Sequence, residues 1–233
     1  MYYEGGPEVL QNITFEVKAK EKIGIVGRTG AGKSSLVAAL MRMPEPQGSI
    51  LMDGVNANKL NLQAWRQSIS VIPQNPILFS GTLRRNIDPT QRFADAEIWQ
   101  VLQDVHLKGL FERLENNLYH ELAEGGKNFS VGERQLICLA RALLQGNKII
   151  VMDEATANVD FKTDQMIQEA IREKFDNRTV LTIAHRISTI MDYDRVLVLH
   201  GGRLIEMDEP TVLLAREDSL FTELTEHSQV EAE

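Results

Sequence analysis

Cysteine is almost absent from this sequence. Its 233 residues include one, Cys138, so an internal disulfide is excluded, and the apolar run at 136–140 indicates a buried, inert thiol. Long apolar segments are missing too: none approaches the roughly 18 residues that cross a membrane, and no signal peptide opens the chain. We therefore expect the chain to be soluble when isolated.

Positive charge is scarce as well. The 25 lysine and arginine residues are outnumbered by 33 aspartate and glutamate residues, which leaves a formal net charge of −8. A nucleic-acid binder needs a basic face, so this balance argues against a nucleic-acid partner. Internal repeats and low-complexity segments are lacking. The length suffices for one α/β domain, or for two subdomains that share a core.

The most informative stretch that is present is Gly-Arg-Thr-Gly-Ala-Gly-Lys-Ser at residues 27–34. It follows the apolar run 23–26 and precedes residues 35–40, which read as a helix. Strand, glycine-rich loop and helix form the context of a phosphate-binding P-loop. The alternative is a glycine-rich turn with a surface lysine, but the complete pattern predicts binding of a nucleoside triphosphate.

Each residue type in this loop has a task. Glycines let successive N–H groups point at phosphate oxygens, and the positive end of the following helix adds to that field. Lys33 is expected to reach the β- and γ-phosphates, and the Ser34 hydroxyl to ligate Mg²⁺. The other residues expected to contact the nucleotide are Gly27, Thr29, Gly30, Ala31, Gly32 and Ser35.

A second magnesium contact is predicted where the apolar run 149–152 ends in Asp153 and Glu154. Ligands of open α/β sheets bind at the carboxyl ends of strands. Asp153 is expected to hold Mg²⁺, and Glu154 to polarise the attacking water as a general base, a role worth about 10²–10⁴-fold in rate. The alternative is an acidic turn that caps the next helix.

Three further polar positions have weaker signals. His185 follows the apolar run 180–184 and could donate a hydrogen bond to the γ-phosphate, although a lone histidine is more often structural. Gln74 ends its own short strand and could touch the magnesium ion or the attacking water. Ser130 opens a helix in a Ser-x-x-Glu capping box with Glu133, and with the Gly132 N–H it could form a second phosphate-binding helix terminus.

Periodicity predicts the surrounding elements. The expected strands span residues 13–17, 48–54, 69–74, 149–152, 180–183 and 196–199. The expected helices span 35–40, about 95–105 with Asp95 as N-cap, about 131–144, and 163–175, followed by a helical, acidic tail from Pro210. The alternation at 13–17 indicates a half-exposed antiparallel strand, whereas 149–152 and 180–183 read as buried strands of a parallel sheet. The expected fold class is α/β.

Taken together, these motifs resemble those of the nucleotide-binding domain of ATP-binding cassette (ABC) proteins. Residues 129–133, Phe-Ser-Val-Gly-Glu, resemble the family signature. Asp153 with Glu154 resembles Walker B, and His185 resembles the H-loop histidine. The motifs stand in family order and cover essentially the whole chain.

Three more assignments come from the resemblance alone. Gln74 matches the Q-loop glutamine, and residues 157–160, Ala-Asn-Val-Asp, are similar to the D-loop, which implies that Asp160 lies near ATP. Tyr2 is similar to the aromatic residue that stacks on adenine. The P-loop, the segment 79–89 and the Ser-Val-Gly signature resemble the second nucleotide-binding domain of C-subfamily multidrug resistance-associated exporters, particularly the short four-type form.

The resemblance also implies an architecture. It implies a single domain over 1–233, with an ATP-binding core and antiparallel β subdomain at 1–83 and 147–233, and a helical subdomain at 84–146. Two such domains would sandwich ATP and Mg²⁺ head to tail, each signature facing the partner's P-loop. Hydrolysis would drive transmembrane domains of the parent transporter in the efflux of organic anions and drugs. This domain would then lie on the cytoplasmic face of a membrane.

One departure and three alternatives remain. Family signatures usually end in glutamine where this chain has Glu133, which would bring negative charge towards ATP. A regulatory nucleotide sensor that gates a channel or receptor would bind ATP in the same way. A cassette ATPase of DNA repair is disfavoured because no coiled-coil heptads interrupt the chain. A nucleotide kinase is also disfavoured, because it would have no role for Ser130 or His185.

Overall fold

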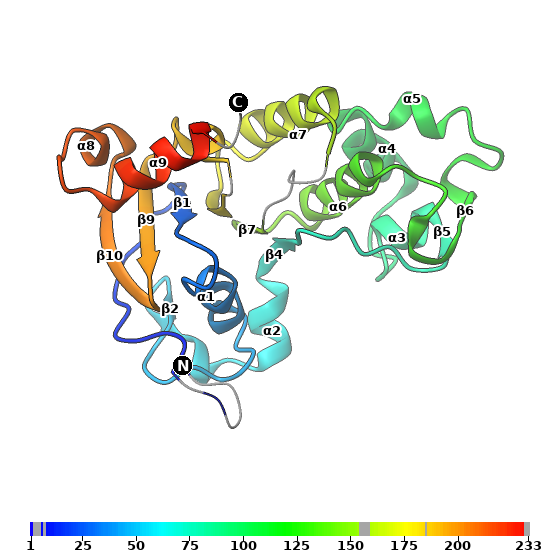
Figure 1. Ribbon diagram of the computed structural model, residues 1–233. Coiled ribbons are helices and arrows are strands. Elements are labelled where there is room, and N and C mark those ends of the chain that lie inside the picture. Colours follow the sequence, from blue (N-terminus) through cyan, green and yellow to red (C-terminus); the bar gives the residue numbers. More distant parts are fainter. Residues whose placement is uncertain (2–5, 7, 154–158, 185, 231–233) are drawn as a thin grey trace. The chain divides into compact units, whose positions relative to one another are not determined.

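The computed structural model describes residues 1, 6, 8–153, 159–184 and 186–230. The chain divides into two compact units, one formed by Met1–Ile69 with Thr179–Glu233 and the other by Ser70–Arg178. Figure 1 labels their helices and strands. No helix of the described ranges is both long and apolar enough to cross a membrane.

The elements have the following bounds. The first unit contains β1 (Lys22–Val26), α1 (Lys33–Leu40), β2 (Leu51–Met52), β3 (Val55–Asn56), η1 (Ala57–Lys59), α2 (Leu62–Gln67), β8 (Thr179–Ile183), η4 (Ile187–Ile190), β9 (Arg195–His200), β10 (Arg203–Asp208), α8 (Pro210–Leu214) and α9 (Leu220–Val230). The strand β4 (Ile69–Ile72) begins at the boundary, and the second unit continues with β5 (Gly81–Thr82), α3 (Leu83–Ile87), α4 (Asp95–Asp104), α5 (Lys108–Phe111), η2 (Asn117–Tyr119), β6 (Glu121–Leu122), η3 (Glu124–Gly126), α6 (Val131–Gln145), β7 (Ile149–Asp153) and α7 (Phe161–Lys174).

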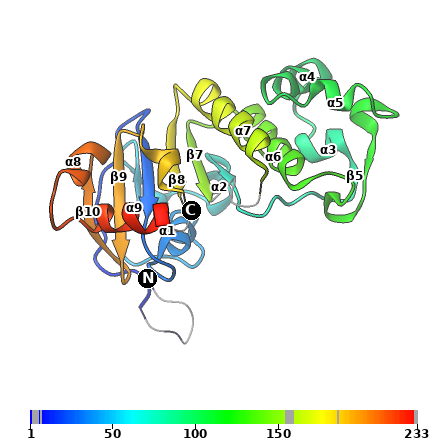
Figure 2. The ribbon, with the colours of Figure 1, turned by 45° about the horizontal axis from the view of Figure 1, so that its top comes forward.

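The sheet of the first unit is built around β1. This strand pairs in parallel with β8 on one side and with β9 on the other, and β10 pairs antiparallel with β9 (Figure 2). Within this register Gly24 lies opposite both Thr182 and Val196. Ile23 and Ile25 are fully buried, as expected for a central strand with covered faces. The glycine-rich loop therefore begins directly at the carboxyl end of this central strand.

Helices near the carboxyl end of the chain cover one face of this sheet. Leu213 of α8, Phe221 of α9 and Ile190 of η4 are fully buried in one cluster with Val196 and Val198 of β9. Full burial of each such side chain contributes about 1.5–3 kcal/mol. The helical tail expected from Pro210 is thus present, and it packs onto the sheet of the first unit.

In the second unit α6 is the central helix. It contacts α3, α4 and α7, and its apolar side buries Leu136, Ile137 and Leu139. In the views of Figures 1 and 2, α6 and α7 run beside each other. The helix ends at Gly146, whose φ of 70° is the left-handed conformation that glycine adopts readily. The strands β4 and β7 of this unit are neighbours in a sheet.

Several expectations are confirmed and three are wrong in detail. Of the strand predicted at 48–54, only Leu51–Met52 is a strand. The strands predicted at 69–74, 149–152, 180–183 and 196–199 and the helix predicted at 131–144 are all present. Residues 13–17 are not a strand: Phe15 is half-buried and Glu16 exposed, as the alternation predicts, but the Glu16 carbonyl accepts a hydrogen bond from the Arg195 side chain instead of a neighbouring strand.

The N-cap of α4 is Ala94 rather than Asp95. The Asp95 carboxylate accepts a hydrogen bond from Arg84 Nε at 2.7 Å, so it is engaged elsewhere. The Ala94 N–H instead donates to Glu97 Oε2 at 2.9 Å. The helical segment predicted at 84–146 lies wholly inside the second unit, and its limits as a subdomain stay a prediction.

Candidate functional site

The glycine-rich loop leaves β1 at a point of very close packing. Gly27 has a φ of 152°, and a Cβ there would lie 2.3 Å from the carbonyl oxygen of Leu199 on β9. The loop then tightens through a bond from the Ala31 N–H to the Arg28 carbonyl at 3.0 Å. Gly32, with φ 105° in the left-handed region, is the N-cap of α1. At positions 27 and 32 only glycine adopts the observed backbone conformation without strain.

The ammonium group of Lys33 lies beneath this loop. Lys33 is 8% exposed, and its Nζ donates to the carbonyls of Gly27 at 2.7 Å and Arg28 at 3.3 Å. A buried cation is stable only when oxygen atoms surround it. The loop carbonyls supply such oxygens and hold the positive charge within the curve of the loop.

The chemistry of the loop fits a polyphosphate. The N-cap residue of α1, Gly32, has no side chain that could cap the helix, and the first turn contains no acidic residue. The N–H groups of that turn therefore point outward with the positive end of the helix. Thr29, Gly30 and Ser34 are exposed, and no atom lies within 4 Å of the position that a Cβ of Gly30 would take. The loop thus presents donors, a cation and open space to an anion.

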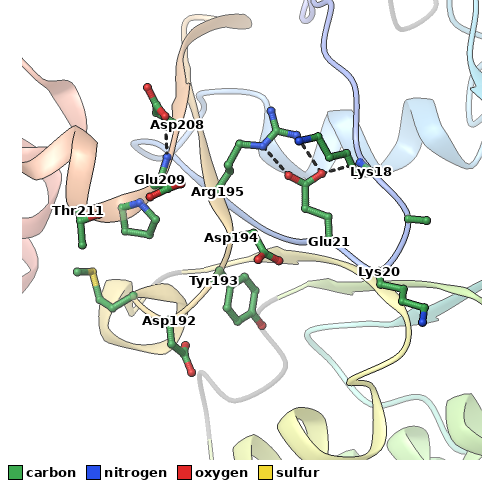
Figure 3. A pocket seen from close by; sticks show the side chains of 13 residues that line it. Lys18, Lys20, Glu21, Asp192, Tyr193, Asp194, Arg195, Asp208, Glu209 and Thr211 are labelled. Atoms are coloured by element: carbon green, nitrogen blue, oxygen red, sulfur yellow. Dashed lines mark hydrogen bonds and ion pairs between the residues drawn. The ribbon is translucent and has the colours of Figure 1, made fainter.

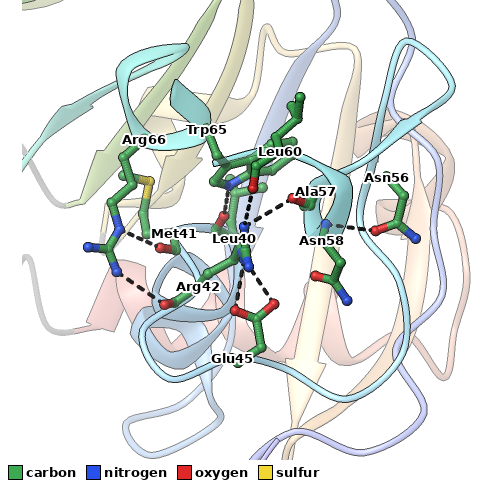
Figure 4. Close-up of polar contacts among 10 residues, drawn as sticks. All are labelled: Leu40, Met41, Arg42, Glu45, Asn56, Ala57, Asn58, Leu60, Trp65 and Arg66. Carbon is green, nitrogen blue, oxygen red and sulfur yellow. Dashed lines mark hydrogen bonds and ion pairs between the residues drawn. The ribbon is translucent and has the colours of Figure 1, made fainter. Parts of the chain in front are cut away.

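The other end of α1 is held by α2, a contact that sequence reasoning missed. Trp65 is fully buried, and its Nε1 donates to the Leu40 carbonyl at 2.7 Å. Arg66 donates to the carbonyls of Met41 and Arg42 at 3.0 and 3.1 Å (Figure 4). These side chains satisfy the carbonyls that every helix leaves open at its C-terminus, and the guanidinium favours the negative end of the helix dipole.

A second unforeseen contact joins the loop to the C-terminal helix. The Arg28 guanidinium donates to Glu223 of α9 at 2.5 Å, and His227 Nε2 lies 3.9 Å from the same carboxylate. Arg28 and Glu223 are each about half-exposed, so the ion pair is worth at most about 1 kcal/mol. The pair fixes the Arg28 side chain against α9.

Two predicted magnesium contacts lie in the second unit. Asp153 is the last residue of β7 and is half-buried, as expected for a carboxylate at the carboxyl end of a strand. Gln74 is exposed, two residues after the end of β4. Gln135 Nε2 donates to the carbonyl of Pro73, the residue just before it, at 3.1 Å.

The N-terminus of α6 carries the predicted capping box. The Glu133 N–H donates to Ser130 Oγ at 3.2 Å, and the Ser130 N–H donates to Glu133 Oε2 at 2.7 Å. This confirms the reciprocal bonds expected from Ser-x-x-Glu. The cap uses the Ser130 hydroxyl as an acceptor, and a hydroxyl also has one donor proton to offer.

The structure brings the signature and the end of the predicted D-loop together. Asp160 caps α7 by accepting a hydrogen bond from the Thr163 N–H at 3.1 Å, and the bonds with Thr163 lower the pKa of its carboxyl group. A Cβ on Gly132 would lie 2.5 Å from Thr163 Cγ2 and 3.1 Å from Val159 Cγ1. Glycine at 132 therefore permits close contact between the beginnings of α6 and α7.

Three predicted site residues, Tyr2, Glu154 and His185, lie outside the described residues, as do Ala157 and Asn158 of the predicted D-loop. Their roles stay predictions. Of the predicted site residues that the structure describes, Gly27 to Ser35 surround the first turn of α1, and the others belong to the second unit: Gln74, Ser130, Gly132, Asp153 and Asp160.

Comparison with known sequences places this arrangement in a family. The sequence profile described as "ABC transporter" matches residues 10–157, more than half of the chain. The chain belongs to the ABC transporter family. Its P-loop is accordingly that of an ATP-hydrolysing cassette domain, as the sequence predicted.

Individual relatives confirm the C-subfamily resemblance. This cassette is 54% identical over 226 residues to human ATP-binding cassette sub-family C member 4, covering 97% of the chain and 17% of the relative. It is 54% identical over 222 residues to ABC transporter C family member 12 of Dictyostelium discoideum (95% and 17%), and 51% identical over 224 residues to multidrug resistance protein mrp-7 of Caenorhabditis elegans (96% and 15%). The chain thus spans about one sixth of the length of these relatives.

A solved structure confirms the fold. A bacterial Atm1-family ABC exporter with ATP bound matches this cassette with a TM-score of 0.88 at 34% identity, over 95% of the chain and 39% of the exporter chain. The expected α/β fold with its mostly parallel sheet is therefore correct.

The ABC cassette also has a hollow of about 640 Å³ in its first unit, which sequence reasoning did not predict (Figure 3). At its base Glu21 accepts two hydrogen bonds from Arg195, at 2.6 and 2.9 Å, and one from the Lys18 N–H at 2.6 Å. Burial raises the pKa of Glu21, but the bonds from Arg195 and Lys18 outweigh it, and the net pKa lies below its ordinary 4.5. The same ion pair raises the pKa of Arg195.

This ion pair is structural. Because the pKa of Glu21 is lowered by folding, the pair stabilises the fold above about pH 4.5 and is lost as the pH falls through the lower, folded-state value. Asp194, which also lines the hollow, accepts from the Lys22 N–H at 2.7 Å. Glu21, Arg195 and Asp194 are thus all engaged within the chain, so we assign the hollow no ligand.

Proposed function

We propose that this chain is a nucleotide-binding domain that binds ATP with Mg²⁺, pairs head to tail with a second such domain, and hydrolyses ATP to drive a C-subfamily exporter of organic anions and drugs. Its transmembrane domains would belong to the longer parent protein, and the cassette would face the cytoplasm. The observation that carries the proposal is the uncapped, glycine-bounded N-terminus of α1 with the buried Lys33 ammonium below it.

Residues of the first unit would bind the phosphates. The N–H groups of Gly30 and of Gly32 to Ser35 would donate to phosphate oxygens, and Lys33 would exchange its loop carbonyls for β- and γ-phosphate oxygens. The exposed Ser34 hydroxyl would serve as a magnesium ligand. Tyr2 would stack on the adenine ring, as the resemblance implies.

Residues of the second unit would complete the metal site and the chemistry. Asp153 and Gln74 provide the oxygen ligands that Mg²⁺ prefers. The ion, when bound, would neutralise negative charge that develops on the β- and γ-phosphates. Glu154 would take the proton of the attacking water, and His185 would donate to the γ-phosphate.

The partner domain would be contacted through the beginnings of α6 and α7. Ser130 would offer its hydroxyl proton, and Gly132 its N–H, to the γ-phosphate held by the partner's P-loop. Asp160 would lie in the same interface. The close packing of Gly132 against Thr163 supports a shared surface for these two motifs.

The experiment that tests the proposal is ATP binding and steady-state ATPase activity of this chain with Mg²⁺, measured against protein concentration. We expect ATP binding, and a rate per domain that rises with concentration as P-loop and signature complete each other in a dimer. Binding with negligible turnover at every concentration would mean that a different partner domain is required. Absence of ATP binding would refute the proposal.

The Glu154→Gln variant separates binding from chemistry. The amide cannot accept the proton of the attacking water, so we expect ATP to remain bound, the dimer to persist, and turnover to fall by about 10²–10⁴-fold. Gel filtration with ATP reports the dimer, and phosphate release reports turnover. Hydrolysis at the wild-type rate would remove Glu154 from its assigned role.

A further inference from the structure

The segment that follows β4 is unusually constrained for a stretch without regular secondary structure. It runs from residue 73 to residue 79, contains Pro73 and Pro76, and includes the predicted magnesium contact Gln74. Gln74 is exposed, and Ile77 is 59% exposed. Proline restricts φ and has no N–H group, so at Pro73 and Pro76 only the carbonyl can bond to other parts of the chain.

One side of α6 holds these carbonyls. Gln135 Nε2 donates to the Pro73 carbonyl at 3.1 Å, and Arg141 Nη1 donates to the Ile77 carbonyl at 3.3 Å. Between them Cys138 interacts with a backbone group of Ile77. The three residues of α6 are spaced by three, which places them on neighbouring turns of one side of the helix.

Gln135 is the unusual member of this set. It is 1% exposed, and its Oε1 has no hydrogen-bond partner among the described residues. A buried amide that makes only part of its hydrogen bonds is unfavourable compared with an apolar side chain of similar size. Stability therefore does not explain a glutamine at this position, whereas its bond to the residue preceding Gln74 offers a reason.

We propose that Gln135 is a positioning residue for Gln74. Its bond to the Pro73 carbonyl fixes the backbone just before Gln74. This sets the direction of the Gln74 side chain and hence the region that its amide can reach. Gln135 lies five residues after Ser130 on the same helix, so it also links Gln74, which serves this chain's own ATP, to the terminus that faces the partner's ATP. The inference rests on the proposed function of Gln74 as a magnesium contact.

The test is Gln135→Met, which keeps length and helix propensity but removes the donor. Affinity for trinitrophenyl-ATP is measured by fluorescence with Mg²⁺ and with EDTA. We expect affinity with Mg²⁺ to fall about tenfold, the lower end of the range for residues that orient metal ligands. Affinity in EDTA should not change, and the melting temperature should stay equal or rise, because the unpaired oxygen is removed.

Two further variants give the controls. Gln145→Met makes the same chemical change at the opposite end of α6, where Gln145 Oε1 accepts from Ser70 Oγ at 3.0 Å, and it should leave the magnesium-dependent affinity unchanged. Gln74→Ala should lower that affinity by itself. If Gln135 acts through Gln74, adding Gln135→Met to Gln74→Ala should produce no further loss.

The outcomes separate the two proposals. A loss in Gln74→Ala but none in Gln135→Met would overturn the positioning role alone. Equal losses with Mg²⁺ and with EDTA, additive losses in the double variant, or a matching loss in Gln145→Met would overturn it as well. No magnesium-dependent affinity in the wild type would refute the proposed function, and the inference with it.

Discussion

The helices α1 and α6 both begin at a motif assigned to ATP, yet their N-termini are built in opposite ways. At α1 the cap is Gly32, which has no side chain to bond the first turn, so the cap residue leaves the terminus open. At α6 Ser130 and Glu133 bond to each other's N–H groups, so the protein closes the terminus itself. At their other ends the contrast is reversed: side chains of α2 hold α1, whereas α6 stops at a glycine.

The difference follows from what each terminus has to bind. An open terminus offers several N–H groups to the many oxygens of a triphosphate, but it needs support from elsewhere while no anion is bound. A capped terminus is stable by itself and still offers the hydroxyl proton of Ser130. In the function we propose, the first arrangement would bind the chain's own nucleotide, and the second would bind an ATP that a partner brings.

The support of α1 from α2 should have the largest effect when it is removed. Trp65→Ala deletes a fully buried ring together with the bond to the Leu40 carbonyl. We expect a loss of about 3–5 kcal/mol in the free energy of unfolding and a fall of about 10 °C in melting temperature. Thermal or urea denaturation followed by circular dichroism measures both.

Trp65→Phe is the matched control, since it keeps most of the ring and loses the donor. Its expected cost from the lost hydrogen bond is about 1 kcal/mol. If Trp65→Ala cost no more than Trp65→Phe, packing against α1 would not be the source of the support.

The second prediction concerns the loop glycines. Gly27→Ala places a Cβ 2.3 Å from the Leu199 carbonyl oxygen at a φ of 152°, so we expect about 3 kcal/mol of destabilisation. Gly30→Ala, at a φ of 80° with no atom within 4 Å, should cost about 1 kcal/mol from backbone strain alone. Chemical denaturation of the two variants compares them. Equal costs would show that close approach to β9 does not matter.

Ser130→Ala opens the terminus of α6. Removal of the side-chain acceptor should cost about 1 kcal/mol of stability and speed amide hydrogen exchange in the first turn of α6. The same exchange measurement should show no change in the first turn of α1. Unchanged exchange at Glu133 would contradict a cap there.

The N-terminus of α7 is capped by Asp160, whose carboxyl group titrates. The pKa of Asp160 is lowered by its bonds with Thr163, so the cap stabilises α7 fully above about pH 3.8 and is lost as the pH falls through the lower, folded-state value. In Asp160→Asn the side chain cannot ionise. We expect the difference in melting temperature between wild type and variant to be present at pH 6 and to vanish near pH 2. A difference that is independent of pH would exclude the carboxylate as its source.

Glu133→Gln should have the smallest effect on stability. Glutamine can accept the Ser130 N–H as glutamate does, so we expect a change within about 0.5 kcal/mol. Removal of the negative charge should modestly strengthen ATP-dependent dimerisation, which light scattering measures beside turnover. No change in dimerisation or turnover would sink the idea that Glu133 weakens the contact with the partner's ATP.

Prediction from the sequence worked where a residue acts through its neighbours in the chain. The loop at residues 27–34 and the Ser130 capping box both depend on bonds within a few residues. It failed where a distant residue intervened. The alternating segment 13–17 has the burial pattern of a strand, but the Arg195 side chain donates to the Glu16 carbonyl. Asp95 does not cap α4, and its carboxylate accepts from Arg84 instead.

The strand β10 was missed for another reason. Gly201 and Gly202, both with positive φ, make the tight turn that pairs β10 with β9, and this Gly-Gly pair was available as a signal. No such signal exists for Trp65, Arg28 with Glu223, or Gln135 with Pro73, because these partners lie between 25 and 195 residues apart in the chain.

Local patterns in the chain were enough to predict its chemistry: a glycine-bounded anion loop with its lysine, a strand that ends in a carboxylate, and a helix with a capping box. These are local patterns whose conformations follow from glycine, hydroxyl and carboxylate groups at fixed spacing. The tertiary structure alone decided what holds those patterns in place, such as the indole that caps α1 and the buried amide that secures the segment before Gln74. Such contacts depend on how elements pack after the chain has folded, and residue spacing carries no record of that packing.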